Sequence, residues 1–255
     1  GSEMCIRDSK YAAFAEGYKV YFDPSTRFMR GLDSEGNWRT PFNPRASNHR
    51  NDDYCEGTAW QWTWFVPHDV DGLVELMGGR DAFIGKLDSL FTADSKLEGE
   101  STSVDISGLI GQYAHGNEPS HHIAHLYNYV GQPWRTQEIV DEVLHTLYFN
   151  NPDGLSGNED CGQMSAWYIL NAMGFYQVCP GKPVYSIGRP LFNEATVHLK
   201  DGKSFKVIAH NNSRDNKYVR SIVLNGNKLE TPFFTHQDIV DGGTLELTMG
   251  SEPLK

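Results

Sequence analysis

The chain has 255 residues, of which 39% are hydrophobic and 12% aromatic, so it is long enough to bury a core and too apolar to remain disordered. It holds 22 Lys and Arg against 33 Asp and Glu, and the resulting net charge of −11 repels nucleic acid phosphates and anionic lipid surfaces. Because no apolar run approaches roughly 18 residues, a membrane span is also excluded, and neutral polar ligands or cations fit the composition best.

The opening of the chain matches no pattern in the rest of the sequence. Residues 1–10 carry no apolar stretch of the kind found in secretion signals, and we interpret them as a non-native or disordered leader. The four cysteines form no Cys-x-x-Cys pair, which favours buried free thiols over a zinc site or a disulfide scaffold. They are Cys5, Cys55, Cys161 and Cys179.

Apolar residues recur mostly at helical spacing from residue 57 to about 174. Pro119 and Pro133 suit the first turn of a helix, and Gly131 and Gly174 can supply a left-handed stop. The pattern predicts helices over 57–65, 71–78, 80–91, 119–130, 133–149 and 162–173. Two segments, 94–116 and 150–162, are rich in Gly, Asp and Asn and are expected to be long loops.

After Pro183 the apolar residues alternate in short runs. Strands are predicted over 195–199, 204–210, 219–224 and 245–249. Asp201-Gly202 and Asn225-Gly226 are tight-hairpin signals, so an antiparallel sheet is expected. The fold class is therefore mainly α followed by an antiparallel β segment, with a helical domain over 11–182 and a β-rich segment over 183–255.

Three polar clusters place an acid beside glycine and aromatic residues, at 52–62, 113–122 and 153–168. In the first, Glu56 precedes the tryptophan-rich helix. Burial against the tryptophans would raise its pKa and make it a general acid, whereas the helix dipole would lower the pKa. The alternative is that Glu56 only caps the helix.

The other two clusters also lie at the start of predicted helices. Asp160 ends a turn with Asn158 and Glu159, where crowded carboxylates would favour a cation or a proton; N-capping by Asp160 is the alternative. Asn117 and Glu118 precede Pro119, where their oxygens could bind a hard cation such as calcium or could simply cap the helix.

The histidines and tryptophans allow two interpretations each. A transition-metal site could use His115, His121, His122 and His125, but polar histidines with satisfied hydrogen bonds fit the spacing better. The tryptophans could pack in the core or stack against sugar rings. They are Trp60, Trp62, Trp64, Trp134 and Trp167.

Together these segments resemble the exo-acting α-mannosidases of glycoside hydrolase family 92. The resemblance covers nearly all the chain from about Tyr11 and rests on YCEGTAWQWTWFVPHDVDGL (54–73), SGLIGQYAHGNEPSHHIAHLYNYVGQPWRTQ (107–137), PDGLSGNEDCGQMSAWYILNAMGFYQVCPG (152–181) and YSIGRPLF (185–192). It implies a calcium-dependent, inverting hydrolysis of terminal α-mannosides, often the α-1,2 linkages of N-glycans. It further implies an (α/α)6 helical toroid joined to a β-sandwich.

Matched residue by residue, the resemblance implies that Glu56 is the general acid and Asp160 the general base. It places metal coordination at Asn117 and Glu118, puts Asn158 near the base and the metal, and implies sugar contacts for Trp60, His68 and His115. The family's N-terminal β-sandwich and the first part of its helical domain have no counterpart here, so the chain resembles a C-terminal portion. The expected partners are mannose-containing glycans and that N-terminal domain, in a secreted or periplasmic bacterial enzyme.

Two other functions remain open from the residues. One is a carbohydrate-binding or structural helical domain without turnover, and the other is a different inverting glycosidase on a helical toroid. If Glu56 and Asp160 face one cleft at the roughly 6.5–9.5 Å typical of inverting enzymes, hydrolysis is favoured; if they point into different surfaces, binding is favoured.

Overall fold

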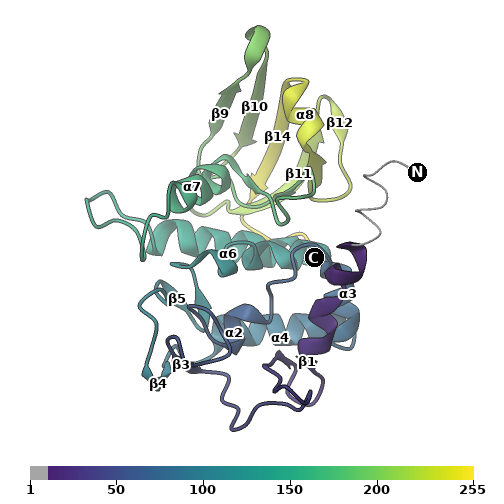
Figure 1. Cartoon of the computed structure of the whole chain (residues 1–255). Coiled ribbons are helices and arrows are strands. Elements are labelled where there is room, and N and C mark those ends of the chain that lie inside the picture. The colour runs from purple at the N-terminus through teal and green to yellow at the C-terminus, as the bar shows by residue number, and fades with distance from the viewer. Residues whose placement is uncertain (1–10) are drawn as a thin grey trace. The chain divides into compact units, whose positions relative to one another are not determined.

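The computed structural model describes residues 11–255, which divide into two compact units at Ser120 and His121 (Figure 1). The leader predicted over 1–10 lies outside the described residues. The predicted division into 11–182 and 183–255 stays a prediction. Within residues 11–255 every helix longer than five residues precedes residue 182, but short strands occur on both sides of it.

The first unit, residues 11–120, consists of short helices joined by loops and two-stranded pairings. Its helical elements are η1 (Gly17–Tyr21), α2 (Ala59–Trp62), α3 (Val70–Leu76), α4 (Arg80–Thr92) and η2 (Glu118–Ser120). The paired strands are β1 (Phe22–Asp23) with β2 (Phe28–Met29), β3 (Ala46–Asn48) with β4 (Glu98–Ser101), and β5 (Leu109–Ile110) with β6 (Tyr113–Ala114).

The core of the first unit forms where α4 packs its apolar face. Phe83, Leu87 and Leu90 recur at three- and four-residue spacing along α4 and are fully buried. The Trp64 ring meets Phe83 edge to face, with centroids 5.3 Å apart. This core supports α2, the helix that follows Glu56.

The second unit, residues 121–255, combines helices with two sheets. The helical elements are η3 (Ile123–His125), α5 (Leu126–Tyr129), α6 (Pro133–Thr146), α7 (Gln163–Met173), η4 (Lys200–Gly202) and α8 (His236–Val240). One sheet has the order β13-β8-β7, from β7 (Phe175–Tyr176), β8 (Val184–Ile187) and β13 (Phe233–Thr235). The other has the order β12-β11-β14-β10-β9, from β9 (Glu194–His198), β10 (Ser204–His210), β11 (Tyr218–Leu224), β12 (Asn227–Lys228) and β14 (Gly243–Gly250).

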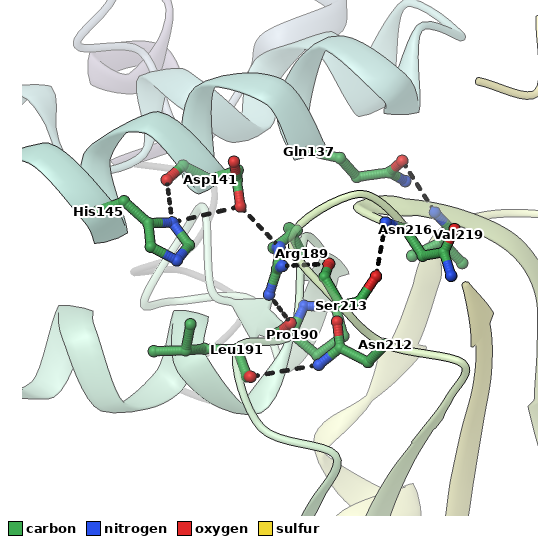
Figure 2. A network of polar contacts seen from close by, with 10 residues as sticks. All are labelled: Gln137, Asp141, His145, Arg189, Pro190, Leu191, Asn212, Ser213, Asn216 and Val219. Atoms are coloured by element: carbon green, nitrogen blue, oxygen red, sulfur yellow. Dashed lines mark hydrogen bonds and ion pairs between the residues drawn. The ribbon is translucent and has the colours of Figure 1, made fainter. Parts of the chain in front are cut away.

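A buried polar network fastens α6 to the strands of the second unit (Figure 2). The Arg189 guanidinium donates to the carbonyls of Pro190 and Ser213. Its Nε lies 2.8 Å from Asp141 Oδ1 on α6, an ion pair by distance although the N–H is not aligned for a hydrogen bond. On the same helix, Gln137 accepts a hydrogen bond from the Val219 amide of β11. Arg189 of YSIGRPLF therefore has a structural role.

The helices predicted over 71–78, 80–91, 133–149 and 162–173 are confirmed as α3, α4, α6 and α7, with α6 ending earlier, at Thr146. The helix predicted over 57–65 is wrong in length: α2 covers only four residues. Pro67 disfavours helical backbone in the residue before it, and Thr63 turns its hydroxyl back onto the Ala59 carbonyl.

The continuous helix predicted over 119–130 is wrong, because this segment is broken into η2, η3 and α5. Its polar side chains are buried and need partners that a regular helix would not align. His125 contacts Asn171 and Ser186, and Asn128 donates to Ser186 and to the Ile187 carbonyl. Leaving these buried polar groups without hydrogen bonds would cost more free energy than the break in the helix does.

All four predicted strands exist, and Asp201, Gly202, Asn225 and Gly226 have the positive φ expected of tight turns. The sheet is nevertheless mixed rather than antiparallel, because β10 and β14 pair in parallel. After β12 the chain leaves this sheet, forms β13 and α8, and returns between β11 and β10. A return of that length permits a parallel pairing that hairpin signals do not reveal.

Two of the cysteines that the structure describes are exposed to solvent. The prediction of buried thiols is wrong for Cys55 and Cys161, which are exposed in turns, while Cys179 is half-buried. Among the helices of residues 11–255, none combines the length and apolar character that crossing a bilayer requires.

Candidate active site

Glu56 occupies an unusual backbone position shortly before α2. Its φ is 51°, in the left-handed region that residues other than glycine, Asn and Asp seldom adopt. The residue is exposed, so the expected burial of its carboxyl against the tryptophans is not observed. Within residues 11–255 its carboxylate has no hydrogen-bond or ion-pair partner, and it therefore remains free for a ligand.

Neighbouring residues, rather than Glu56, cap the helix. The Thr58 hydroxyl accepts from the Trp60 amide, and the Gln61 side chain reaches back to the Thr58 amide to complete a capping box. The capping alternative for Glu56 is therefore wrong. The indole N–H of Trp62 donates to the Cys55 carbonyl at 2.7 Å.

Asn117 connects the second polar cluster to the first. Its side-chain N–H donates to the Glu56 carbonyl at 2.8 Å across 61 residues of sequence, and its side-chain oxygen accepts from the Glu118 amide at 3.1 Å. Asn117 is buried, whereas Glu118 is half-buried at the start of η2. Three predicted site residues thus lie together in the first unit.

Trp60 and His68 have contacts of their own in the first unit. The Trp60 ring packs edge to face against Phe28, and the Lys86 ammonium lies 4.7 Å from the Trp60 ring centroid. Burial lowers the pKa of Lys86 to about 8. His68 binds the Ala15 carbonyl through Nε2 at 2.9 Å and meets the Tyr18 ring edge. Sugar contacts by Trp60 and His68 stay predictions.

His115 is fully buried, and its Nδ1 lies 2.8 Å from the Tyr113 hydroxyl oxygen. Its burial leaves no exposed surface for a sugar, so the predicted sugar contact of His115 stays a prediction. His121, His122 and His125 are buried too. In the second unit, His121 Nδ1 faces Gln163 and the His125 ring nitrogens face Ser186 and Asn171. The polar-histidine interpretation fits these contacts.

Asp160 resembles Glu56 in its local setting. It is exposed, its φ is 55°, and it lies shortly before Gln163, the first residue of α7. The carboxylate that serves the helix mouth is that of Glu159, which accepts from the Gly162 and Ser165 amides. N-capping by Asp160 is therefore wrong. The Glu159 pKa is lowered by the hydrogen bonds from Ser165 and Gly162. Asn158 is also exposed.

Sequence reasoning missed the structural roles of Trp62 and Glu159. Trp62 is one of several tryptophans in one segment, and the sequence feature that could have identified its role is Gly57. A Cβ at Gly57 would lie 2.7 Å from the Trp62 indole nitrogen, so the glycine makes room for that ring. Glu159 and Asp160 are adjacent acids, and only the folded structure separates the capping carboxylate from the free one.

Each unit has a cavity, and neither predicted acid lines it. In the first unit, Cys55 and Trp62 border a cavity of about 380 Å³ whose other walls include Tyr18, Tyr21, Tyr54 and Phe65. In the second unit, a cavity of about 630 Å³ has no charged residue in its lining, which includes Tyr148, Phe149, Tyr168 and Ile169. Aromatic walls suit the apolar faces of sugars.

The residues around Asn117 supply oxygen donors rather than a preformed metal cluster. Among residues 11–255, no three His, Cys, Asp or Glu side chains are grouped so that they could hold a metal. In the first unit, the Glu118 carboxylate and the Asn117 amide oxygen are hard donors of the type calcium prefers. This donor set fits calcium better than a transition metal.

Comparison with known proteins gives a consistent result. The model of the glycosyl hydrolase family 92 catalytic domain matches residues 6–251. The structure of the family GH92 alpha-mannosidase from Bacteroides thetaiotaomicron in complex with mannoimidazole is 43% identical, with a TM-score of 0.86 over 93% of this chain and 32% of that one. The family GH92 inverting mannosidase from Bacteroides thetaiotaomicron VPI-5482 is 41% identical, with a TM-score of 0.83 over 96% of this chain and 34% of that one.

A secreted glycosidase of Arthroderma benhamiae is 32% identical over 200 residues, which are 77% of this chain and 24% of that protein. The chain thus spans about a quarter to a third of the length of these relatives. A family model that extends over nearly all its residues, together with structural likeness above 40% identity, assigns the chain to glycosyl hydrolase family 92.

Proposed function

We propose that this chain forms the part of an exo-α-mannosidase that carries both catalytic carboxylates, with Glu56 as general acid and Asp160 as general base. One observation carries the proposal: both residues are exposed on left-handed backbone just before a helix, and other side chains serve the helix mouths. Non-glycine residues in such backbone are concentrated at functional sites. Membership of a family that includes alpha-mannosidases supports the same function.

The proposed reaction inverts the anomeric centre of a terminal α-mannoside. The Glu56 carboxyl donates its proton to the glycosidic oxygen as the bond to C1 breaks. The Asp160 carboxylate takes a proton from the water that attacks C1 from the opposite face of the sugar ring. The two carboxyl groups are expected about 6.5–9.5 Å apart, which leaves room for that water. Trp60, His68 and His115 are proposed to contact the sugar.

Calcium is proposed as the cofactor, held by the Glu118 carboxylate and by amide oxygens of Asn117 and Asn158. When bound, it would engage sugar hydroxyls and favour the distorted ring of the transition state. The rest of the proposal follows the family: an (α/α)6 toroid, completion of the site by an N-terminal β-sandwich, α-1,2-linked mannosides of N-glycans as substrates, and a secreted or periplasmic location.

The test measures mannose release from α-1,2-mannobiose by the chain alone. It also uses a chimera in which the chain replaces the matching third of the 43% identical Bacteroides mannosidase. Glu56→Gln and Asp160→Asn should each slow turnover by about 100-fold or more, while Asp153→Asn, an exposed change in the same loop as Asp160, should not. NMR of the first product should show the β-anomer.

Retention of the α-anomer would overturn the inverting mechanism. Full activity of both carboxylate variants would overturn the assigned roles. If the chain and the chimera bind mannobiose without hydrolysing it, the carbohydrate-binding alternative is correct.

A further inference from the structure

The backbone at Glu56 is held in place by two side chains from other parts of the first unit. A left-handed conformation is unfavourable for a residue with a Cβ. Such a conformation persists only where surrounding contacts fix it. The Cys55 carbonyl accepts from the Trp62 indole at 2.7 Å, and the Glu56 carbonyl accepts from the Asn117 side chain at 2.8 Å.

The Asn117 side chain is itself held rigidly. It is 6% exposed, and its side-chain oxygen accepts from the Glu118 amide at 3.1 Å. The Asn117 carbonyl accepts from the Ser120 amide at 3.1 Å in the turn of η2. Since one end of the amide accepts from a backbone N–H, the other end must present its N–H groups, and one of them points at the Glu56 carbonyl.

We propose that Asn117 is a positioning residue for Glu56, because its side-chain amide fixes the left-handed peptide from which the Glu56 carboxyl projects toward the leaving oxygen. The inference rests on the proposed role of Glu56 as general acid. Proton transfer requires the carboxyl within hydrogen-bond reach of that oxygen. A small displacement of the turn therefore slows protonation without removing the carboxyl itself.

Asn117→Asp separates this role from that of a metal ligand. The substitution keeps the size of the side chain and an oxygen that could bind a cation. It removes the N–H group that donates a hydrogen bond to the Glu56 carbonyl. A carboxylate oxygen would then face a carbonyl oxygen, which is repulsive. Asn117→Ser provides a second variant without added charge; because it also removes the amide oxygen proposed to bind calcium, both variants are assayed at saturating calcium.

The readout is the dependence of the rate on the leaving group. Hydrolysis of α-1,2-mannobiose requires protonation of the leaving alcohol. From a 2,4-dinitrophenyl α-mannoside, the leaving group is a stable phenolate that departs without protonation. Loss of general-acid assistance should therefore lower kcat on the disaccharide and leave kcat on the aryl mannoside nearly unchanged. The assay uses the chain if it turns over alone, and otherwise the chimera.

We expect Asn117→Asp and Asn117→Ser to lower kcat on mannobiose by about 10–100-fold, a fraction of the 10²–10⁴ typical of general acids. On the aryl mannoside the loss should be less than about 3-fold, and KM should change little. Asn128→Asp is the matched control, since Asn128 is also buried and donates to a backbone carbonyl, that of Ile187, in the second unit. It should not discriminate between the two substrates.

The outcomes distinguish the inference from the function on which it rests. If Glu56→Gln selectively slows mannobiose but neither Asn117 variant does, the inference is overturned and the role of Glu56 stands. Equal losses on both substrates in the Asn117 variants would likewise overturn it. If Glu56→Gln itself shows no dependence on the leaving group, the proposed general-acid role fails first.

Discussion

Glu159 and Asp160 are adjacent carboxylates that the structure puts to different uses. The Glu159 carboxylate accepts hydrogen bonds from the Gly162 and Ser165 amides at the N-terminus of α7. Asp160 is exposed on left-handed backbone. A helix N-terminus favours a negative charge, which accounts for Glu159 as the capping group. The strained residue beside it is the one free to act on a ligand.

The helix mouth at Gly162 should therefore depend on pH. The hydrogen bonds from Ser165 and Gly162 lower the pKa of Glu159, so this carboxylate stays charged above the ordinary glutamate range and protonates only below it. Its contribution is present at neutral pH and is lost as the pH falls through the lowered pKa. The Gly162 amide proton, followed by NMR, should titrate with a midpoint below that of an ordinary glutamate.

Glu159→Gln is the control, because an amide cannot titrate and the Gly162 shift should then stay flat. A midpoint at or above the ordinary glutamate value would show that Glu159 does not hold these amides.

His125 provides a second pH-dependent effect, in the interior of the second unit. It is fully buried, and burial lowers its pKa to about 4, against an ordinary value of 6.5. Between these values the unfolded chain binds the proton and the folded chain does not, so the stability present above pH 6.5 declines as the pH falls toward 4. The difference between the two pKa values corresponds to about 3 kcal/mol of unfolding free energy.

Urea denaturation at pH 7.5 and pH 4.5 measures this decline. His125→Gln should be less stable at pH 7.5 but should lose less stability on acidification than the unmodified chain. Equal losses in the two proteins would mean that other groups cause the acid sensitivity.

Sequence patterns predicted helices and turns correctly where local backbone preference and burial favoured the same structure. α4 was predictable because Phe83, Leu87 and Leu90 recur on one helical face, and the tight turns were predictable because Asn225-Gly226 needs positive φ. The broken segment around His125 was not, because its backbone follows buried polar partners distant in sequence, such as Asn171. The parallel pairing of β10 and β14 depends on the path of the chain through β13 and α8.

In the candidate site, too, local sequence patterns do not reveal contacts between distant residues. The motifs identified Glu56, Asn117 and Asp160 as polar residues at helix starts. The hydrogen bond from Asn117 to Glu56 joins positions 61 residues apart. No local pattern distinguishes a side chain that would bind a cation from one that holds a distant peptide.

The attachment of α6 to the sheets can be tested through Arg189. Arg189→Met would leave the largely buried Asp141 carboxylate with only the His145 imidazole, 3.3 Å away, as an ion-pair partner. It would also remove the hydrogen bonds to the Pro190 and Ser213 carbonyls (Figure 2). Breaking a buried pair from one side costs about 3–5 kcal/mol. Urea denaturation should show a loss of this size.

The double variant Asp141→Leu with Arg189→Met is the matched comparison, because it removes both charges. It should be more stable than Arg189→Met alone, since no buried charge is left unpaired. A double variant as unstable as the sum of the two single changes would mean that the two residues stabilise the protein independently.

Across the whole molecule, the proposed chemistry is distributed over both compact units. The proposed acid with Asn117 and Glu118 lies in residues 11–120, and the proposed base with Asn158 lies in residues 121–255. Since each unit contributes only part of the proposed machinery, hydrolysis should require both units. The share of the relatives that the chain spans, 24–34%, makes the remaining part of the enzyme a further requirement of the proposal.

Removal of calcium tests the proposed calcium requirement of the whole enzyme. Treatment of the chimera with EDTA should abolish mannobiose hydrolysis, and calcium, but not zinc, should restore it, because the proposed donors are carboxylate and amide oxygens. Glu118→Gln should raise the calcium concentration needed for half-maximal activity by about 10-fold or more, since it removes the charged ligand. The exposed Asp153→Asn should leave that concentration unchanged. Hydrolysis that persists in excess chelator, after dialysis confirmed by metal analysis, would rule out a calcium requirement while leaving the roles of Glu56 and Asp160 intact.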